Sequence, residues 1–251
     1  MTDTGAADLF WWVGLPYLAL AVFVVGHIWR WRYDQFGWTS RSTQLQERKW
    51  LKYGGPLFHY GTFAAIAGHV LGILIPASWT EAIGIPEHVY RWFSAGAGTL
   101  AAILVIIGVV VLALRRLLVP RVRATTAPVD YVALILLLVV IITGIAPTLF
   151  INLLGAGYDY RTTVAPWFRG LFALQPDTAA ISTAPWIYRI HATAAWIIWG
   201  VWPFSRLVHA WSAPVFYLWR PYIVYRSRKQ GVKPPEPGTG GRKWRKIGTP
   251  Y

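Results

Sequence analysis

Histidines are the residues of this chain whose type and spacing could do chemistry. Six are present without a single cysteine, which excludes a thiolate metal site, a Cys-ligated iron–sulfur cluster and a disulfide framework. Imidazole is the commonest protein ligand for metals. His59 and His69 stand 10 residues apart, and His191 and His209 stand 18 apart. The remaining two are His27 and His88.

Long apolar segments must position these histidines. The chain is 55% hydrophobic and 14% charged, whereas a soluble domain carries roughly a quarter charged residues, so a cytosolic globular enzyme is excluded. A helix that crosses the bilayer core of about 30 Å needs roughly 20 apolar residues. We therefore expect an all-α integral membrane protein whose membrane domain spans 1–225, followed by a flexible, basic, Pro/Gly-rich tail at 226–251. The five expected transmembrane helices are Phe10–Trp29, Gly54–Ile75, Ser94–Leu114, Pro128–Leu153 and Pro185–Ser205.

The basic residues predict the orientation. Of the 24 Lys and Arg residues, six lie in Arg30–Lys52, four in Arg115–Arg123 and ten from Arg206 onward. These segments fall on one side of the membrane, which the positive-inside rule makes cytoplasmic. We expect a multi-pass protein of the inner cell membrane with its N-terminus outside and its C-terminus cytoplasmic. The net charge of +14 is then explained by orientation and anionic lipid, and nucleic acid is not an expected partner.

This topology predicts two histidine pairs at matching depths. The second segment runs outward and the fifth runs inward, so His69 pairs with His191 near the outer face and His59 with His209 near the inner face. Two histidines that face each other across a bundle are the axial ligands of a six-coordinate b-type haem, which needs no cysteine. The sequence therefore predicts two b-type haems. The alternative is that each histidine is a hydrogen-bonded bundle residue, the reading favoured for the unpaired His27 and His88.

The two spacings place a demand on helix geometry. On straight helices, 10 residues rise about 15 Å, whereas 18 residues rise about 27 Å and return to the same face. Both pairs can form only with tilt or bending, and Pro203 is placed to kink the fifth helix. Small residues near the ligands are expected to leave room for a porphyrin: Gly55, Gly61, Gly68, Gly72, Ala192, Ala194 and Ala195.

Several stretches together carry a family resemblance. They are R-Y-D-Q-F-G-W at 32–38, F-H at 58–59, G-H at 68–69, R-R-L-L-V-P-R-V-R-A-T-T at 115–126 and P-F-S-R-L-V-H-A-W-S-A-P-V at 203–215. With the 10- and 18-residue histidine spacings, they resemble the gamma subunit of respiratory nitrate reductase, a di-haem cytochrome b, as far as about Arg228.

The resemblance implies a role for each histidine pair. His69 and His191 would ligate the distal, outer haem, and His59 and His209 the proximal, inner one. The family oxidises ubiquinol or menaquinol near the distal haem and releases protons outside. Electrons pass through both haems to an iron–sulfur beta subunit and a molybdenum-containing alpha subunit on the cytoplasmic side, where nitrate becomes nitrite. This chain has no cluster ligands or molybdenum site of its own, so its expected part is quinol oxidation and electron transfer.

The quinol site departs from the family pattern. Relatives carry a lysine in the loop after the second span, but Pro76–Arg91 contains none, and Glu87 or His88 stands near its place. His88 is a candidate proton acceptor, because histidine exchanges protons near neutral pH. An exposed loop histidine is the alternative. Gly68, beside the ligand His69, is a second candidate contact for the quinol.

Arg206 and the basic segments allow two readings each. Arg206 precedes His209 by three residues, so it could pair with a propionate of the proximal haem, or it could simply reach the membrane surface. The run at 115–123 and the tail would bind the soluble subunits as well as set the orientation.

A di-haem subunit of another membrane oxidoreductase, such as a thiosulfate or heterodisulfide reductase, would share the histidines but not the 115–126 and 203–215 stretches. A transporter or structural anchor would explain the spans but not four depth-matched histidines.

Overall fold

The fold is seen in a computed structural model that describes residues 5–39, 41–212 and 219. Every regular element among these residues is a helix, as the sequence predicts. The tail expected at 226–251 lies outside the described residues.

Four helical segments of the described chain are long and apolar enough to cross a membrane: Ala6–Tyr33, Leu51–Leu74, Glu87–Leu118 and Pro128–Leu153. They agree with the first four predicted spans: the fourth has the predicted bounds, and the other three are extended or shifted by a few residues. They comprise α1 (Ala6–Leu9), η1 (Phe10–Gly14), α2 (Leu15–Tyr33), α3 (Leu51–His69), η2 (Val70–Leu74), α5 (Glu87–Leu118), α7 (Pro128–Ala146) and η3 (Pro147–Leu153). Shorter helices join them: α4 (Ala77–Ala82), α6 (Pro120–Ala124), η4 (Tyr160–Thr162), α8 (Val164–Phe172) and α9 (Thr178–Thr183).

The fifth predicted span differs from a single long helix. Helix α10 (Trp186–Val201) has 16 residues and gives way to the short 3-10 helix η5 (Trp202–Phe204). An extended Ser205 (φ −111°, ψ 179°), the 3-10 helix η6 (Arg206–Val208) and the short helix α11 (His209–Ser212) follow. Pro203 explains the break, because proline lacks an N–H and its ring clashes with the carbonyl one turn earlier. The 18-residue spacing alone suggested that His191 and His209 share one face of a straight helix. Because of the break, they do not.

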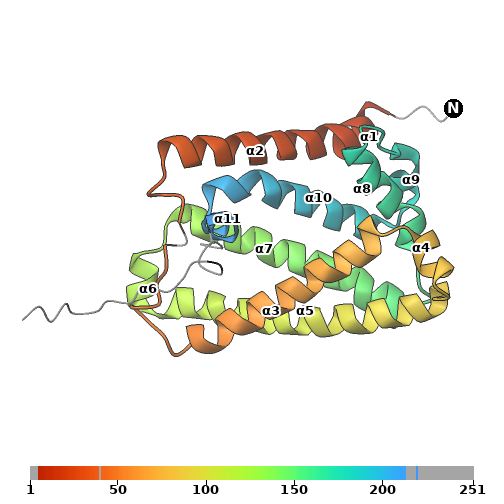
Figure 1. Cartoon of the computed structure of the whole chain (residues 1–251). Coiled ribbons are helices and arrows are strands. Elements are labelled where there is room, and N and C mark those ends of the chain that lie inside the picture. The colour runs from red at the N-terminus through yellow and green to blue at the C-terminus, as the bar shows by residue number, and fades with distance from the viewer. Residues whose placement is uncertain (1–4, 40, 213–218, 220–251) are drawn as a thin grey trace, which may run out of the picture. The chain divides into compact units, whose positions relative to one another are not determined.

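The helices form an antiparallel bundle (Figure 1). The loop 34–50, α6 and residues 202–212 gather at one end, which we call the basic end. Helices α4, α8 and α9 lie at the other, which we call the opposite end. Helix α3 packs mainly on α5, whereas α10 packs mainly on α7 and α2. The predicted basic segments thus share one end of the bundle as far as they are described.

Glycines allow α3 and α5 to approach closely. A Cβ at Gly61 would stand 2.7 Å from both Val105 Cγ2 and the Val105 backbone nitrogen, and 2.9 Å from the Ala101 carbonyl oxygen. On the facing helix, Gly108 lies directly against the backbone of Phe58. Small residues at a helix contact are typical of membrane bundles, where close van der Waals packing replaces the hydrophobic effect.

Arg115 ties the loop 34–50 to the end of α5. Its Nε forms an ion pair with Glu47 Oε2 at 2.7 Å. Nη1 donates to Thr43 Oγ1 at 2.9 Å, and Nη2 donates to the carbonyl oxygens of Thr43 at 2.9 Å and Glu47 at 2.7 Å. Because Arg115 is buried, these acceptors satisfy a cation that would otherwise be costly.

Substitution of Gly61 tests the helix contact. We expect Gly61→Ala to lower the free energy of unfolding by about 1–3 kcal/mol, because the added methyl group forces α3 and α5 apart. Gly96→Ala is the matched control on α5, since a Cβ there meets nothing within 4 Å; it should leave stability unchanged or raise it by up to about 1 kcal/mol. Thermal unfolding of the detergent-solubilised protein measures both. Equal midpoints for the two variants would contradict the packing.

The Glu47 ion pair predicts a pH dependence. Burial alone would raise the pKa of Glu47, but hydrogen bonds from Arg115 and from the backbone N–H groups of Trp50 and Lys49 outweigh burial and lower it from its ordinary value of 4.5. A carboxylate with a lowered pKa stabilises the fold above its unfolded pKa, and this stability is lost as the pH falls through the lowered value. Wild type should therefore unfold at a higher temperature than Glu47→Gln at pH 7, and the difference should shrink below about pH 4.5. A difference independent of pH would count against the ion pair.

Candidate functional site: two histidine pairs

The structure brings both predicted histidine pairs together. His69, at the end of α3, and His191 of α10 have ring centroids 5.9 Å apart with an angle of 37° between the rings. His59, nearer the start of α3, and His209 of α11 have centroids 5.8 Å apart at 74°. The first pair lies toward the opposite end and the second toward the basic end.

These spacings suit a metal between the rings. A metal–imidazole bond is about 2 Å long, so two such bonds and the radii of two imidazole rings place ring centroids roughly 6 Å apart. No point among the described residues gathers three or more His, Asp or Glu side chains that could hold a metal. Each pair therefore offers two imidazole nitrogens, and a cofactor would have to supply any further metal ligands.

Three of the four histidines bind backbone carbonyls through Nδ1. The acceptor is the Gly55 oxygen for His59 at 2.8 Å, the Ala65 oxygen for His69 at 2.7 Å and the Arg206 oxygen for His209 at 2.7 Å. A carbonyl only accepts, so Nδ1 carries the hydrogen. The neutral ring then keeps its lone pair on Nε2, the arrangement that outer hydrogen bonds produce in metal-ligating histidines.

His191 reaches the same state through Thr143 of α7. Its Nδ1 lies 3.3 Å from Thr143 Oγ1, and that hydroxyl donates its own hydrogen to the Val139 carbonyl at 2.7 Å. The hydroxyl oxygen therefore accepts from Nδ1 of His191. All four histidines thus have Nε2 free to act as a ligand.

Gly144 makes room for the His191 ring. A Cβ at this position would stand 2.7 Å from His191 Cε1, so any larger residue would displace the imidazole. Sequence analysis missed both Thr143 and Gly144. Nothing in an apolar helix identifies them beyond their small size and polarity, because their role depends on which helix packs against α7.

The expected space for a porphyrin needs correction at two of the small residues. Gly61 faces α5, and Gly72 lies against the Tyr160 hydroxyl. Protein atoms therefore fill the space beside both glycines, and a porphyrin would not fit there. Gly68 meets nothing within 4 Å, and Gly55 meets only Leu51 of its own helix turn. His59 and His69 are themselves exposed on α3.

His27 and His88 have no histidine partner among the described residues. His27 Nδ1 donates to the Phe23 carbonyl at 2.7 Å, and its ring lies 4.3 Å from the Phe23 ring centroid in an aromatic cluster. His88 is exposed on the first turn of α5. No ring contact of the described residues joins His88 to His69 or His191.

Arg206 contacts His209 differently from the sequence expectation. The two residues do not lie on one α-helix, because η6 ends where α11 begins. Their link is the bond from Nδ1 of His209 to the Arg206 carbonyl, while the guanidinium forms an ion pair with Asp130 at 2.8 Å. A propionate contact of Arg206 stays a prediction. Asp130 was not singled out from the sequence, although a carboxylate within an apolar run is a signal of function or buried pairing.

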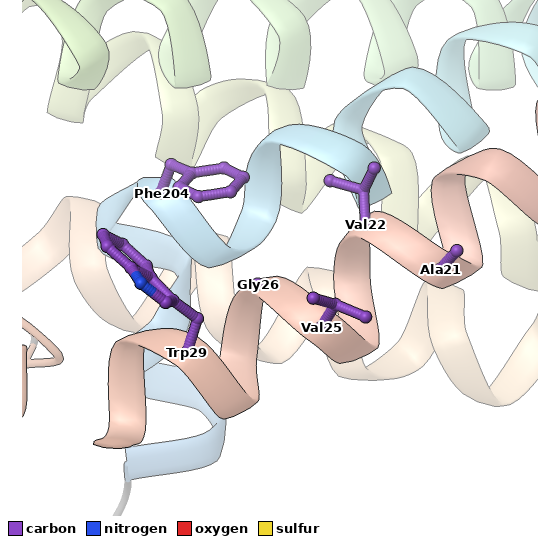
Figure 2. A pocket seen from close by; sticks show the side chains of 6 residues that line it. All are labelled: Ala21, Val22, Val25, Gly26, Trp29 and Phe204. Carbon is purple, nitrogen blue, oxygen red and sulfur yellow. The ribbon is translucent and has the colours of Figure 1, made fainter. Parts of the chain in front are cut away.

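An apolar groove of about 430 Å³ lies between α2 and η5 (Figure 2). It is lined by Ala21, Val22, Val25, Gly26, Trp29 and Phe204. Beside it, a Cβ on Gly26 would stand 2.9 Å from Pro203 Cβ, so this glycine admits the bend of the chain. The lining offers only the Trp29 indole as a polar side-chain group, and the histidine pairs remain the candidate site.

The sequence is similar to those of known proteins over most of its length. A family model described as nitrate reductase gamma subunit matches residues 8–228. The nitrate reductase gamma chain of Bacillus subtilis (strain 168) is 44% identical over 217 residues, which cover 86% of this chain and 97% of that protein. The respiratory nitrate reductase 1 gamma chain of Escherichia coli (strain K12) is 33% identical over 222 residues, covering 88% and 98%. The nitrate reductase-like protein NarX of Mycobacterium tuberculosis (strain H37Rv) is 42% identical over 226 residues, 90% of this chain but 34% of that protein. The chain therefore belongs to the nitrate reductase gamma subunit family.

Proposed function

We propose that this chain is the di-haem cytochrome b subunit of a quinol:nitrate oxidoreductase. His69 and His191 would hold the distal b-type haem, and His59 and His209 the proximal one. The observation that carries the proposal is the pair of ring spacings, 5.9 and 5.8 Å, on rings whose Nδ1 atoms are already bonded. The donor set fits the group, because each position supplies two imidazole nitrogens, the chain has no cysteine, and no carboxylate among the described residues joins either pair.

Bound haem supplies reversible one-electron transfer, and the protein provides its position and surroundings. A single centre cannot serve both faces of a hydrocarbon layer about 30 Å thick. The 10 residues between His59 and His69 separate the two positions by about 15 Å along α3. Two centres at these depths divide the insulating layer into shorter steps.

The basic end would face the cytoplasm, with the N-terminus outside and α10 together with η5 forming the fifth crossing. This orientation follows the positive-inside rule and the gathering of loop 34–50 and α6 at one end. The iron–sulfur beta subunit and the molybdenum-containing alpha subunit would bind there. The protein would thus be a multi-pass subunit of the inner cell membrane.

Quinol, either ubiquinol or menaquinol, would be oxidised at the opposite end, beside the His69–His191 pair. Gly68 has open space next to it and directly precedes His69, so a quinol ring could approach there without a side chain in the way. His88 is exposed on the first turn of α5 and would accept a proton for release to the outside.

Haem content tests the ligand assignment directly. Wild type should carry two b-type haems per chain by pyridine haemochrome and by the reduced-minus-oxidised spectrum. His69→Ala or His191→Ala should each lose one haem and abolish quinol oxidation. His59→Ala or His209→Ala should lose the other haem and block electron delivery to the partner subunits.

His27→Ala is the matched control, because its ring also bonds a helix carbonyl through Nδ1 but faces no second histidine. It should keep both haems. Retention of two haems by all four ligand variants, or absence of haem from correctly assembled wild type, would overturn the proposed function.

The proton acceptor is tested separately with His88→Gln. We expect the rate at which a menaquinol analogue reduces the protein to fall about 10- to 100-fold, since a positioned general base contributes at least this much. Haem content and spectrum should stay as in wild type, which separates this role from ligation. An unchanged stopped-flow reduction rate would remove His88 from the proposal.

A further inference from the structure

Asp130 is a buried carboxylate at the first turn of α7, where an apolar helix begins. Its side chain is 1% exposed, and its Oδ2 accepts the backbone N–H of Ala127 at 2.9 Å. Removing a carboxylate from water costs several kcal/mol unless cations and hydrogen bonds compensate it. The residues that contact the Asp130 carboxylate therefore indicate its role.

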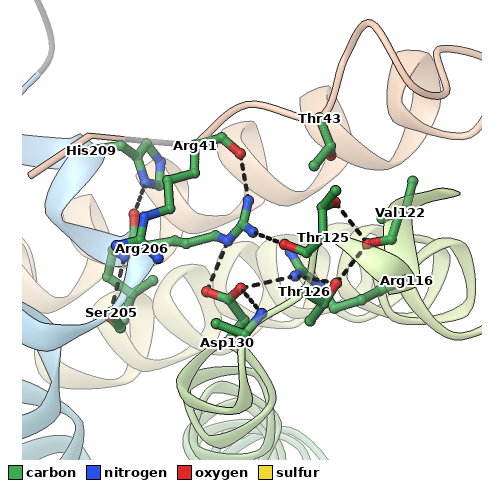
Figure 3. Close-up of polar contacts among 12 residues, drawn as sticks. Arg41, Thr43, Arg116, Val122, Thr125, Thr126, Asp130, Ser205, Arg206 and His209 are labelled. Atoms are coloured by element: carbon green, nitrogen blue, oxygen red, sulfur yellow. Dashed lines mark hydrogen bonds and ion pairs between the residues drawn. The ribbon is translucent and has the colours of Figure 1, made fainter. Parts of the chain in front are cut away.

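Arg206 is the tight partner (Figure 3). Its Nε lies 2.8 Å from Asp130 Oδ1, whereas Nη1 of Arg116 lies 3.6 Å from Oδ2. The rest of the Arg206 guanidinium donates to the carbonyl oxygens of Arg41 and Thr125. Asp130 thus holds the side chain of Arg206 in one place between α7 and the loops of the basic end.

The backbone of the same arginine holds His209. The Arg206 carbonyl oxygen accepts the Nδ1 hydrogen of His209 at 2.7 Å. A short chain of contacts therefore runs from the Asp130 carboxylate through both ends of Arg206 to the imidazole. Among the described residues Asp130 makes no hydrogen bond or ion pair with His209, so it acts through Arg206.

This chain of contacts lies where the helix provides no continuous support. After Val201, the backbone passes through η5, an extended Ser205 and η6 before α11 begins at His209. Local hydrogen bonds help, such as Trp202 Nε1 to the Leu207 carbonyl at 2.8 Å. Among the described residues 202–212, the Asp130–Arg206 pair is the only ion pair that joins this segment to another helix.

We infer that Asp130 is a positioning residue for His209: its ion pair with Arg206 sets where the axial imidazole stands opposite His59. This inference rests on the proposed function and adds to it a residue that touches neither haem ligand. It also gives the half-buried charge of Arg206 a role that does not require a propionate. Outer partners of this kind typically alter metal affinity 10- to 100-fold.

The test compares Asp130→Asn and Arg206→Gln with wild type. The proximal signals are first identified as those missing from His209→Ala. Transfer of haem to a scavenging apoprotein should then be about tenfold faster for the proximal haem in both variants, with its low-spin electron paramagnetic resonance signal shifted. The distal signal should not change. Arg206→Lys keeps the cation and should restore most of the proximal retention.

Glu47→Gln is the matched control. Glu47 belongs to a second buried ion pair at the basic end, 2.7 Å from Arg115, whose contacts run to the loop and not to His209. Both haem signals should match wild type. An equal change of the proximal signal in Glu47→Gln would show a general loosening of this end and overturn the inference.

Other outcomes are equally decisive. If Arg206 acted by binding a propionate, Asp130→Asn would free the cation and leave proximal retention unchanged or stronger, which would overturn the inference. Equal loss of both haems in Asp130→Asn would make its role merely structural and also overturn it. Absence of haem from wild type would instead refute the proposed function, so the two failures are told apart by the wild-type sample alone.

Discussion

The break at Pro203 is the constraint that allows His209 to pair with His59 while His191 pairs with His69. Helix α10 continues for ten residues beyond His191, to Val201, the same number that separates His59 from His69 on α3. A continued helix would carry His209 about 12 Å further along its axis, past the level of His59. Because proline ends the helix, the chain turns aside and returns the imidazole to that level, where its centroid lies 5.8 Å from that of His59.

The break has a cost that other helices offset. Residues 202–208 lie outside regular α-helix, so their position depends on contacts with neighbours. Gly26 of α2 admits Pro203, and Asp130 of α7 binds Arg206. An ion pair in a low-dielectric environment restrains geometry strongly, and removing either partner would leave a costly buried charge. The carboxylate at the start of an apolar helix is therefore explained by the segment that it restrains.

The Nδ1 atoms of the four imidazoles form hydrogen bonds of two different kinds. His59, His69 and His209 use a carbonyl three or four residues earlier in the chain, a bond that local helical structure supplies. His191 instead uses Thr143 of a neighbouring helix, with Gly144 clearing the space beside it. The pair toward the opposite end thus depends on the packing of α10 against α7, and the pair toward the basic end depends on the break after Val201.

The residue pattern was enough to predict the all-helical fold, four helices long and apolar enough to cross a membrane, and the pairing of four histidines. These follow from hydropathy and antiparallel topology, which are local or additive along the chain. Three features were decided only by the tertiary structure. Gly61 and Gly72 were expected beside a porphyrin but face α5 and Tyr160, because helical spacing says which residues share a face but not which neighbour that face meets. The fifth segment was expected as one helix. A proline permits either a kink or a break, and only the packing against α2 and α7 selects the break. The Asp130–Arg206 pair joins residues 76 positions apart, and no pattern within either helix specifies a contact made between them.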